Sequence, residues 1–298
     1  MRVLVTGATG FIGTAVVREL IGAGHKVLGL TRSDAGAAAL KAAGAEAHHG
    51  TLEDLESLRS GARASDGVIH LAFIHDFSKF KENCETDRRA IEAIGDALAG
   101  SDRPLVITSG TGMANTMPGQ PAMEDNAVLS SAAIPRAASE EAAATLAARG
   151  VNVSVVRLPQ VHDKVKQGLV TYAIAVAREK GVSAYIGEGQ NRWPAAHILD
   201  TARLYRLVLE KREAGAKYHA VAEEGVPMRD IADVIGRGLQ VPVVSITPEE
   251  AAAHFGWLAH FAVRDIPASS AQTRKKLGWN PTGPGLIADL ERMRYFPT

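Results

Sequence analysis

The segment "TGATGFIG" (residues 6–13) constrains the fold of this chain more than any other feature of the sequence. It comes directly after the apolar run "RVLV" and opens a stretch with the apolar spacing of a helix. In that context the first glycine permits a tight turn, the second lets the backbone approach a pyrophosphate, and the third permits close packing of helix on strand. The helix N-terminus then offers unpaired N–H groups to phosphates. The predicted dinucleotide site consists of Gly7, Thr9, Gly10, Phe11, Ile12 and Gly13.

The first half of the chain alternates short β-branched runs with longer helical patterns, which is typical of a parallel sheet covered by helices. We expect strands at 2–6, 26–31, 46–49, 67–72, 104–109 and 152–158. The helices expected between them lie at 11–24, 35–44, 52–61, 77–100 and 137–150, each closing on glycine. The predicted fold class is α/β, a Rossmann doubly wound parallel sheet with a small C-terminal α/β lobe.

After about Pro159 the pattern changes to helices with isolated short strands. We therefore expect a dinucleotide-binding domain over residues 1–160 and a mainly substrate-binding lobe over 161–298, interleaved with the first domain. A chain of 298 residues with 46% hydrophobic residues can fill a sizeable core without staples. The segment "HFGWLAHF" (254–261) is aromatic and amphipathic, which indicates ordinary packing, with a lid or a dimer face as the alternative.

The charge and cysteine content exclude several classes of partner. The chain has 33 basic and 33 acidic residues and no run of like charge, so we expect neither nucleic acid nor membrane as a partner. The single cysteine, Cys84, indicates a reduced cytoplasm. Glycines interrupt the apolar N-terminus, and no apolar run approaches the length of a membrane span. The histidines lack companions at metal-ligand spacing, so we predict no metal and a small-molecule substrate.

The end of the second predicted strand, "LGLTRSD", bears on the choice of cofactor. An acidic residue at this tip would bind the ribose 2′-hydroxyl of NAD, but here Arg32 and Ser33 come before Asp34. An arginine suits a 2′-phosphate. The strand end therefore predicts NADPH rather than NADH, with a surface arginine at a strand end as the alternative.

Five further segments carry a family resemblance: "GTLEDLESL" (50–58), "DGVIHLAF" (66–73), "PLVITSG" (104–110), "VVRLPQVH" (155–162) and "AAHILDTARL" (195–204). With "TGATGFIG", they make the chain resemble the extended short-chain dehydrogenase/reductase superfamily. The resemblance implies that Leu52 lies near the adenine, although Thr51 stands where the family usually has aspartate. It implies that Leu71, Ala72 and Phe73 pass along the cofactor. It also implies that Pro159 to His162, including Val161, lie beside the nicotinamide, and it allows a homodimer through the helices at 78–99 and 136–149.

The chain departs from this family at the proton donor. The family's chemistry normally needs a Ser or Thr after the fifth strand and a Tyr followed four residues later by Lys. Matching Glu140 to a helix glutamate of the family puts the tyrosine position on Ala132 and the lysine position on Arg136. An alternative alignment puts Pro135 and Ser139 there, so the tyrosine is missing either way. The serine position falls on Gly110, between Ser109 and Thr111.

Another group must therefore handle the proton, because arginine does not titrate near neutral pH. The candidates are the hydroxyl of Ser109 or Thr111, the imidazole of His162 or His197, an ordered water, or a hydroxyl of the substrate. Histidine suits a proton transfer near pH 7, although structural roles are the alternative for both histidines. Arg136 would anchor the cofactor or polarise the carbonyl.

Two aromatic residues, Tyr185 and Trp193, are candidates for the wall of an apolar substrate pocket. Core packing is the commoner fate of such side chains and is the alternative for both.

These observations predict an NADPH-dependent carbonyl reductase of ketones, aldehydes or C=N compounds with an atypical proton donor. One alternative is a non-catalytic NADP-binding sensor or scaffold, which the missing Tyr and Lys favour. Another is a nucleotide-sugar epimerase or dehydratase, which needs proton abstraction by a strong base. A reductase consumes its cofactor, whereas an epimerase recycles it, so cofactor consumption separates the two enzymes.

Overall fold

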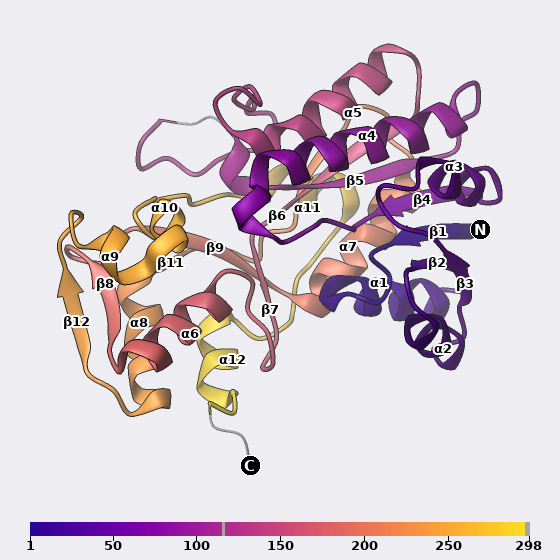
Figure 1. The fold of residues 1–298 in the computed structure, drawn as a ribbon. Coiled ribbons are helices and arrows are strands. Elements are labelled where there is room, and N and C mark those ends of the chain that lie inside the picture. The colour runs from indigo at the N-terminus through magenta and orange to yellow at the C-terminus, as the bar shows by residue number, and fades with distance from the viewer. Residues whose placement is uncertain (115–116, 296–298) are drawn as a thin grey trace.

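A parallel sheet of seven strands organises the molecule, which a computed structural model describes over residues 1–114 and 117–295 (Figure 1). The strand order is β10-β6-β5-β4-β1-β2-β3, and every neighbouring pair is parallel. The strands are β1 (Arg2–Thr6), β2 (Lys26–Thr31), β3 (Glu46–His49), β4 (Gly67–His70), β5 (Leu105–Gly110), β6 (Val153–Leu158) and β10 (Lys217–His219). The predicted fold class, an α/β Rossmann sheet, is confirmed. The chain order reverses between β1 and β4, which is where sheets of this kind bind ligands.

Helices cover both faces of this sheet. On one face lie α1 (Phe11–Gly22), α2 (Asp34–Ala42) and α7 (Ile198–Lys211), and on the other lie α3 (Leu55–Arg63), α4 (Phe80–Leu98) and α5 (Ala138–Ala148). Figure 1 shows α4 and α5 together along one side of the sheet and α1 and α2 on the other. Such double coverage explains why the strands read as continuous apolar runs.

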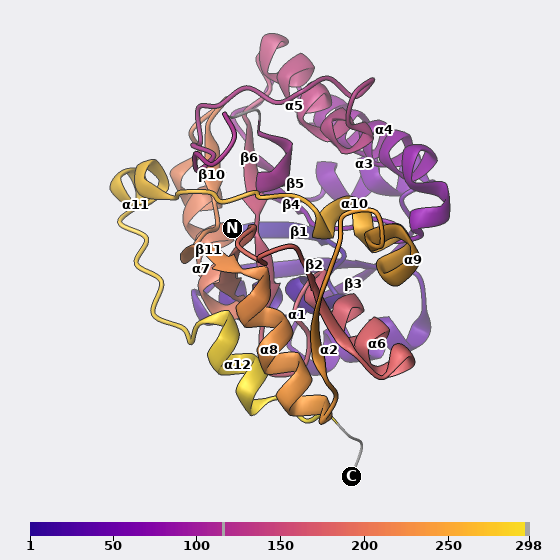
Figure 2. The ribbon, with the colours of Figure 1, turned by 90° about the vertical axis from the view of Figure 1, so that its left-hand side faces the viewer.

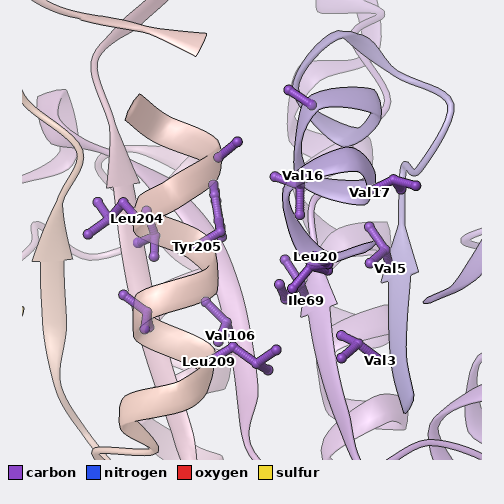
Figure 3. Close-up of a cluster of buried hydrophobic side chains, with 14 of the residues drawn as sticks. Val3, Val5, Val16, Val17, Leu20, Ile69, Val106, Leu204, Tyr205 and Leu209 are labelled. Atoms are coloured by element: carbon purple, nitrogen blue, oxygen red, sulfur yellow. The ribbon is translucent and has the colours of Figure 1, made fainter. Parts of the chain in front are cut away.

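The alternation of side chains along β1 assigns successive residues to the two faces. Val3 and Val5 pack with α1 and α7, whereas Leu4 packs with α3 and α4. Figure 3 shows the first of these cores, where Leu20 of α1 and Tyr205 of α7 approach the strands. Full burial of one such aliphatic side chain stabilises the fold by about 1.5–3 kcal/mol.

A second lobe is built from short elements. It contains the sheet β11-β9-β7 and the strand pair β12-β8. Its strands are β7 (Gln160–His162), β8 (Ser183–Ile186), β9 (Arg192–His197), β11 (Glu223–Pro227) and β12 (Val243–Ile246). Its helices are α6 (Val170–Lys180), α8 (Met228–Leu239), α9 (Ala251–Phe255), α10 (Ala259–Ala262) and α12 (Leu286–Arg292). These elements enclose a separate hydrophobic core around Trp193. Figure 2 shows α8 and α12 side by side in this lobe.

The two lobes are interleaved in sequence. The chain leaves the large sheet after β6, returns to it with α7 and β10, and leaves again at β11. A short helix, α11 (Ala271–Leu277), then packs beside β10 and α7. The segment 198–219 therefore lies with the first lobe, although it follows residue 160.

Several boundaries differ from those expected. The strand expected at 67–72 ends at His70, because the Thr6 hydroxyl accepts the N–H groups of Leu71 and Ala72 at 3.1 Å each and diverts them from strand pairing. The single-turn 3₁₀ helices η1 (Phe77–Lys79), η2 (Thr111–Met113), η3 (Pro135–Ala137) and η4 (Gly256–Leu258) were not expected. Among the described residues, no helix combines the length and the apolar character needed to cross a bilayer.

Candidate functional site

The loop between β1 and α1 forms a cradle that glycine alone can build. Gly7 has a φ of +65°, and a Cβ on it would lie 2.9 Å from the backbone nitrogen of Ala72. A Cβ on Gly13 would overlap the carbonyl oxygen of Gly7. At Gly10 a Cβ would meet only that same oxygen, at 3.1 Å. Gly7 and Gly13 are thus required by the fold itself, whereas Gly10 leaves its backbone open to an approaching group.

The start of α1 offers an anion site at this loop. Gly10 is the N-cap residue, so no side chain caps the helix, and no acidic residue lies in the first turn. The first N–H groups of a helix have no partner within the helix. The positive end of the helix dipole adds to their attraction for phosphate. The cradle therefore fits the pyrophosphate of a dinucleotide, with Thr9 exposed and Phe11 and Ile12 half-buried around it.

The tip of β2 presents Arg32 to solvent. Its guanidinium forms neither a hydrogen bond nor an ion pair with any residue that the structure describes. The next residue, Ser33, caps α2 by accepting the N–H of Gly36 at 3.1 Å, which leaves the O–H of Ser33 available to donate. Leu52, after β3, is buried. The Thr51 hydroxyl accepts the N–H of Asp54, the N-cap residue of α3, at 3.2 Å.

A hydrogen-bonded chain runs beneath the loop that follows β4. The Thr6 hydroxyl accepts from Leu71 and Ala72, so it donates its own proton to Nδ1 of His70, 2.9 Å away. With Nδ1 accepting, the proton of His70 lies on Nε2, which donates to Asp87 at 3.0 Å. The network thus fixes the neutral Nε2–H tautomer of His70.

Asp87 is the centre of this network. Its side chain is 1% exposed, and it accepts from His70, from Arg136 at 2.9 Å and from Ser139. Burial alone would raise the pKa of Asp87, but the Arg136 charge and the hydrogen bonds from His70 and Ser139 hold that pKa below its ordinary value. Asp87 is therefore a carboxylate at neutral pH.

Arg136, in η3, holds three parts of the site together. It donates to Asp87 on α4 and, at 2.9 Å, to the carbonyl oxygen of Thr108 on β5. Its guanidinium also lies 4.4 Å from the ring centroid of Phe73. The side chain is 14% exposed. The cation at the family's lysine position is thus an anchor between α4, the end of β5 and the loop after β4.

The end of β5 carries two buried hydroxyls, those of Ser109 and Thr111. Ser109 is buried, and its Oγ has no hydrogen-bond partner among the described residues. Thr111 is also buried and donates a long hydrogen bond, 3.4 Å, to the carbonyl oxygen of Leu158. A Cβ on Gly110 would meet nothing nearer than that oxygen, at 3.8 Å. This strand end can thus donate hydrogen bonds to an oxygen of a bound molecule.

His162 and His197 lie together in a second cluster. β7 and β9 pair in parallel, which sets the two residues opposite each other with ring centroids 5.9 Å apart. His162 is fully buried and bonds Asp289 at 2.7 Å. Burial lowers the pKa of His162, and the Asp289 carboxylate offsets this only in part. Within the described residues, no hydrogen bond or ion pair joins this cluster to Ser109, Thr111 or Arg136.

His197 has a structural role of its own. Its Nδ1 accepts the N–H of Leu199 at 3.3 Å and so caps α7. Its Nε2 lies 3.9 Å from the carboxylate of Asp289. These contacts agree with the alternative that the sequence left open for His197, a hydrogen-bonded structural histidine.

Three further side chains expected at the site pack elsewhere. Trp193 is completely buried in the core of the second lobe, and Val161 is buried in the first core, so neither ring nor isopropyl group faces a cavity. Tyr185 lies on β8 with the Arg229 guanidinium 5.5 Å from its ring centroid. Pro159 is half-buried between β6 and β7. Trp193, Val161 and Tyr185 thus lie on β9, β7 and β8, whereas Pro159 lies in the link between β6 and β7.

His75, which lies in the loop after β4, was not predicted as a site residue from the sequence. Its exposed ring contacts Phe73 edge-on at a centroid distance of 5.3 Å. Partial burial and the nearby charges of Lys166 and Arg136 lower the pKa of His75. The signal was present in "AFIHDFSKF" (72–80), where rings recur directly after a buried strand.

Comparison with known proteins supports this description. A profile described as "NAD dependent epimerase/dehydratase family" matches residues 3–222. An uncharacterised protein of Schizosaccharomyces pombe is 49% identical over 297 residues, covering 99% of this chain and 100% of the relative. A 2′-dehydrokanamycin reductase of Streptomyces kanamyceticus is 30% identical over 267 residues, covering 85% of this chain and 71% of that protein.

Among solved structures, the dTDP-glucose 4,6-dehydratase DesIV of Streptomyces venezuelae, with NAD and TYD bound, is similar with a TM-score of 0.79. Its sequence is 20% identical, and the likeness covers 99% of this chain and 96% of that one, so it bears on the fold alone. The profile match over most of the chain shows more. This chain belongs to the NAD-dependent epimerase/dehydratase family.

Proposed function

We propose that this protein is an NADPH-dependent reductase of ketones, aldehydes or related C=N compounds. The observation that carries the proposal is the buried hydroxyl of Ser109 at the end of β5, which has no hydrogen-bond partner among the described residues. This strand end and the glycine cradle lie at the same edge of the sheet, because β1, β4 and β5 are parallel neighbours. A reductase needs a hydrogen-bond donor to the substrate oxygen at that place.

Each residue at the site would have its own role in the reduction. NADPH, when bound in the cradle, would supply a hydride to the carbonyl carbon. Ser109 and Thr111 would donate hydrogen bonds to the carbonyl oxygen, and Arg136 would hold their strand end in position. His75 would deliver the proton, directly or through a water, and would regain it from solvent, since its ring is exposed.

The preference for NADPH over NADH rests on Arg32. Arg32, at the tip of β2, has no partner within residues 1–114 and 117–295, and such a cation is suited to a 2′-phosphate, which would make charge-assisted hydrogen bonds with it. The O–H of Ser33 would add a second donor.

An epimerase or dehydratase is the weaker candidate. Such enzymes abstract a proton from carbon or from a hydroxyl with a strong base, and neither Ser109 nor Thr111 has a partner among the described residues that would deprotonate it. The relative named as a 2′-dehydrokanamycin reductase supports carbonyl reduction.

The test is NADPH consumption by the purified protein against a panel of ketones, aldehydes and cyclic imines, with NADH in parallel. We expect substrate-dependent oxidation of NADPH that Ser109→Ala lowers and that a substitution in the outer strand pair, Ser245→Ala, leaves unchanged. NADPH binding without any oxidation across the panel would favour the sensor or scaffold. Turnover of a nucleotide sugar without net cofactor consumption would favour the epimerase.

A further inference from the structure

Aromatic residues are concentrated at one place between the two lobes. The chain has only 7 Phe, 5 Tyr and 3 Trp. Six of these rings form one connected network, which we call the aromatic bridge: Phe73, Phe77, Phe80, Tyr172, Trp257 and Phe261. The first three come from the segment after β4, and the others come from α6 and from the η4–α10 segment of the second lobe.

The centre of the aromatic bridge is a parallel stack. The rings of Phe77 and Trp257 have centroids 4.2 Å apart and an interplanar angle of 13°. Tyr172 meets Trp257 edge-on at 5.0 Å. Trp257 is nevertheless 43% exposed, whereas Trp193 and Trp279 are 0% and 2% exposed. A large ring that is stacked on one side and open on another is a surface for a further flat group.

Two contacts connect the aromatic bridge to the end of β5, where we propose that the carbonyl group binds. At one end, Phe73 lies under Arg136, which in turn donates to Thr108 beside Ser109. At the other, Arg264, just after α10, donates to the carbonyl oxygen of Gly112 at 3.1 Å. The segment that carries Trp257 and Phe261 is therefore tied to the residue that follows Thr111, at the end of β5.

The aromatic rings of this surface favour a ligand with a planar ring. Ring pairs in stacked or edge-to-face arrangements are stabilised beyond the area that they bury, which a saturated ring of the same size does not gain. We infer that the substrate is a planar, conjugated carbonyl compound, such as an aryl aldehyde or aryl ketone, whose ring packs on Phe77 and Trp257 while its C=O points to Ser109 and Thr111. This inference rests on the proposed function, since it assigns the substrate class of the same site.

Kinetics with a matched pair of aldehydes tests the inference. Benzaldehyde and cyclohexanecarboxaldehyde carry the same group on rings of six carbons, but only the first ring is planar. We expect wild-type protein to prefer benzaldehyde, and Phe77→Leu and Trp257→Leu to lower the ratio of the two kcat/KM values about 3- to 10-fold, the range of one lost ring pair. Val263→Ala, an exposed apolar position on the same segment, is the control and should leave the ratio unchanged. Because the ratio is taken within each variant, it does not depend on the fraction folded.

A binding measurement separates this inference from the proposed function. With NADP⁺ present, benzaldehyde should quench the fluorescence of Trp257 saturably. Trp257→Phe should abolish the quenching, since the other two tryptophans are buried, and Phe77→Leu should raise the apparent Kd. Saturable quenching without turnover of any carbonyl would overturn the proposed function and keep the aromatic site. Turnover with equal kcat/KM for the two aldehydes, a ratio unchanged by both substitutions, or the lack of saturable quenching would overturn the inference.

Discussion

Among single residues, Arg136 stands at the position where the family usually has lysine, and its contacts give it a different role. A lysine there would be a flexible point charge, whereas the planar arginine bonds Asp87 and Thr108 at once and lies over Phe73. We expect Arg136→Ala to lower kcat/KM by about 100-fold and the free energy of unfolding by about 2–4 kcal/mol, because Asp87 would remain buried without its counter-charge.

Steady-state kinetics and chemical denaturation check both effects. Arg136→Lys should lose less stability than Arg136→Ala, because it keeps the charge beside Asp87. Activity of Arg136→Ala close to that of wild type would remove the role assigned to this residue.

Arg32 governs the choice of cofactor at the same scale. Charge-assisted hydrogen bonds contribute about 1.5–3 kcal/mol, so Arg32→Ala should lower the ratio of NADPH to NADH affinity by about 10- to 100-fold. Titration calorimetry with both cofactors measures that ratio. If the ratio stays the same, Arg32 is a surface residue and the NADPH preference is lost.

His75 predicts a pH dependence for the reduction. Only the protonated imidazole can donate, and burial with the charges of Lys166 and Arg136 lowers the pKa of His75. The protonated fraction, and with it the rate of reduction, should therefore fall as the pH rises through a value below 6.5. His75→Asn should flatten that limb of the pH–kcat/KM profile, and a profile identical to wild type would exclude His75 as the donor.

The residue-scale predictions from sequence succeeded where the interaction is local. The roles of Gly7 and Gly13 follow from a turn between adjacent elements, and the structure confirms that each must lack a Cβ. The partner of Arg136 could not be predicted, since Asp87 lies on another helix. The pairing of β7 with β9, which sets His162 opposite His197, could not be predicted either, because no local pattern encodes that pairing.

In the loop between β1 and α1, Gly13 is needed for the fold, whereas Gly10 is needed for dinucleotide binding. A Cβ on Gly13 would overlap the Gly7 carbonyl, whereas one on Gly10 would make only a tight 3.1 Å contact. Gly13→Ala should therefore lower the melting temperature markedly. Gly10→Ala should keep the fold but weaken dinucleotide binding by more than about 10-fold, since the methyl group would occupy the approach of the pyrophosphate.

Thermal denaturation and cofactor titration of the two variants test this separation. Equal losses of stability in Gly10→Ala and Gly13→Ala, or unchanged cofactor affinity in Gly10→Ala, would contradict it.

Element prediction followed the length of the apolar runs. The first six strands of the large sheet and the helices between them were predicted within a few residues, because long buried runs carry a strong periodic signal. The short strands β7 and β11 and the helices α9 to α12 were missed. The helices α9 to α12 have only four to seven residues, too few for a helical period to repeat, so the sequence alone does not reveal them.

At the scale of the whole molecule, a buried polar cluster fastens the C-terminal segment to the sheet. Arg157 on β6 makes two hydrogen bonds to Glu140, at 2.9 and 2.8 Å, and donates to Nε2 of His219 at 3.3 Å. Nδ1–H of His219 donates to the carbonyl oxygen of Ser269 at 2.8 Å. The ring is thus held in its neutral form. Burial, helped by the Arg157 charge, lowers the pKa of His219 to about 4.

This cluster predicts acid sensitivity of the fold. The unfolded chain binds a proton at His219 near pH 6.5, but the folded chain does so only near pH 4. Stability should therefore fall as the pH drops from about 6.5 to about 4, by at most about 3–4 kcal/mol for this residue. Denaturant titrations across that range should show a smaller loss in His219→Gln than in wild type, whereas His260→Gln, at an exposed ring, should behave as wild type. Equal losses in all three proteins would contradict the assignment.

We propose that the cradle and the end of β5 act together to transfer a hydride to a carbonyl group. The most direct measurement uses NADPH deuterated at the transferable position of the nicotinamide, with benzaldehyde and a simple ketone as substrates and mass spectrometry of the products. The account predicts one deuterium on the carbinol carbon and one NADP⁺ formed for each alcohol. Bound cofactor that transfers no deuterium to any carbonyl compound would contradict it.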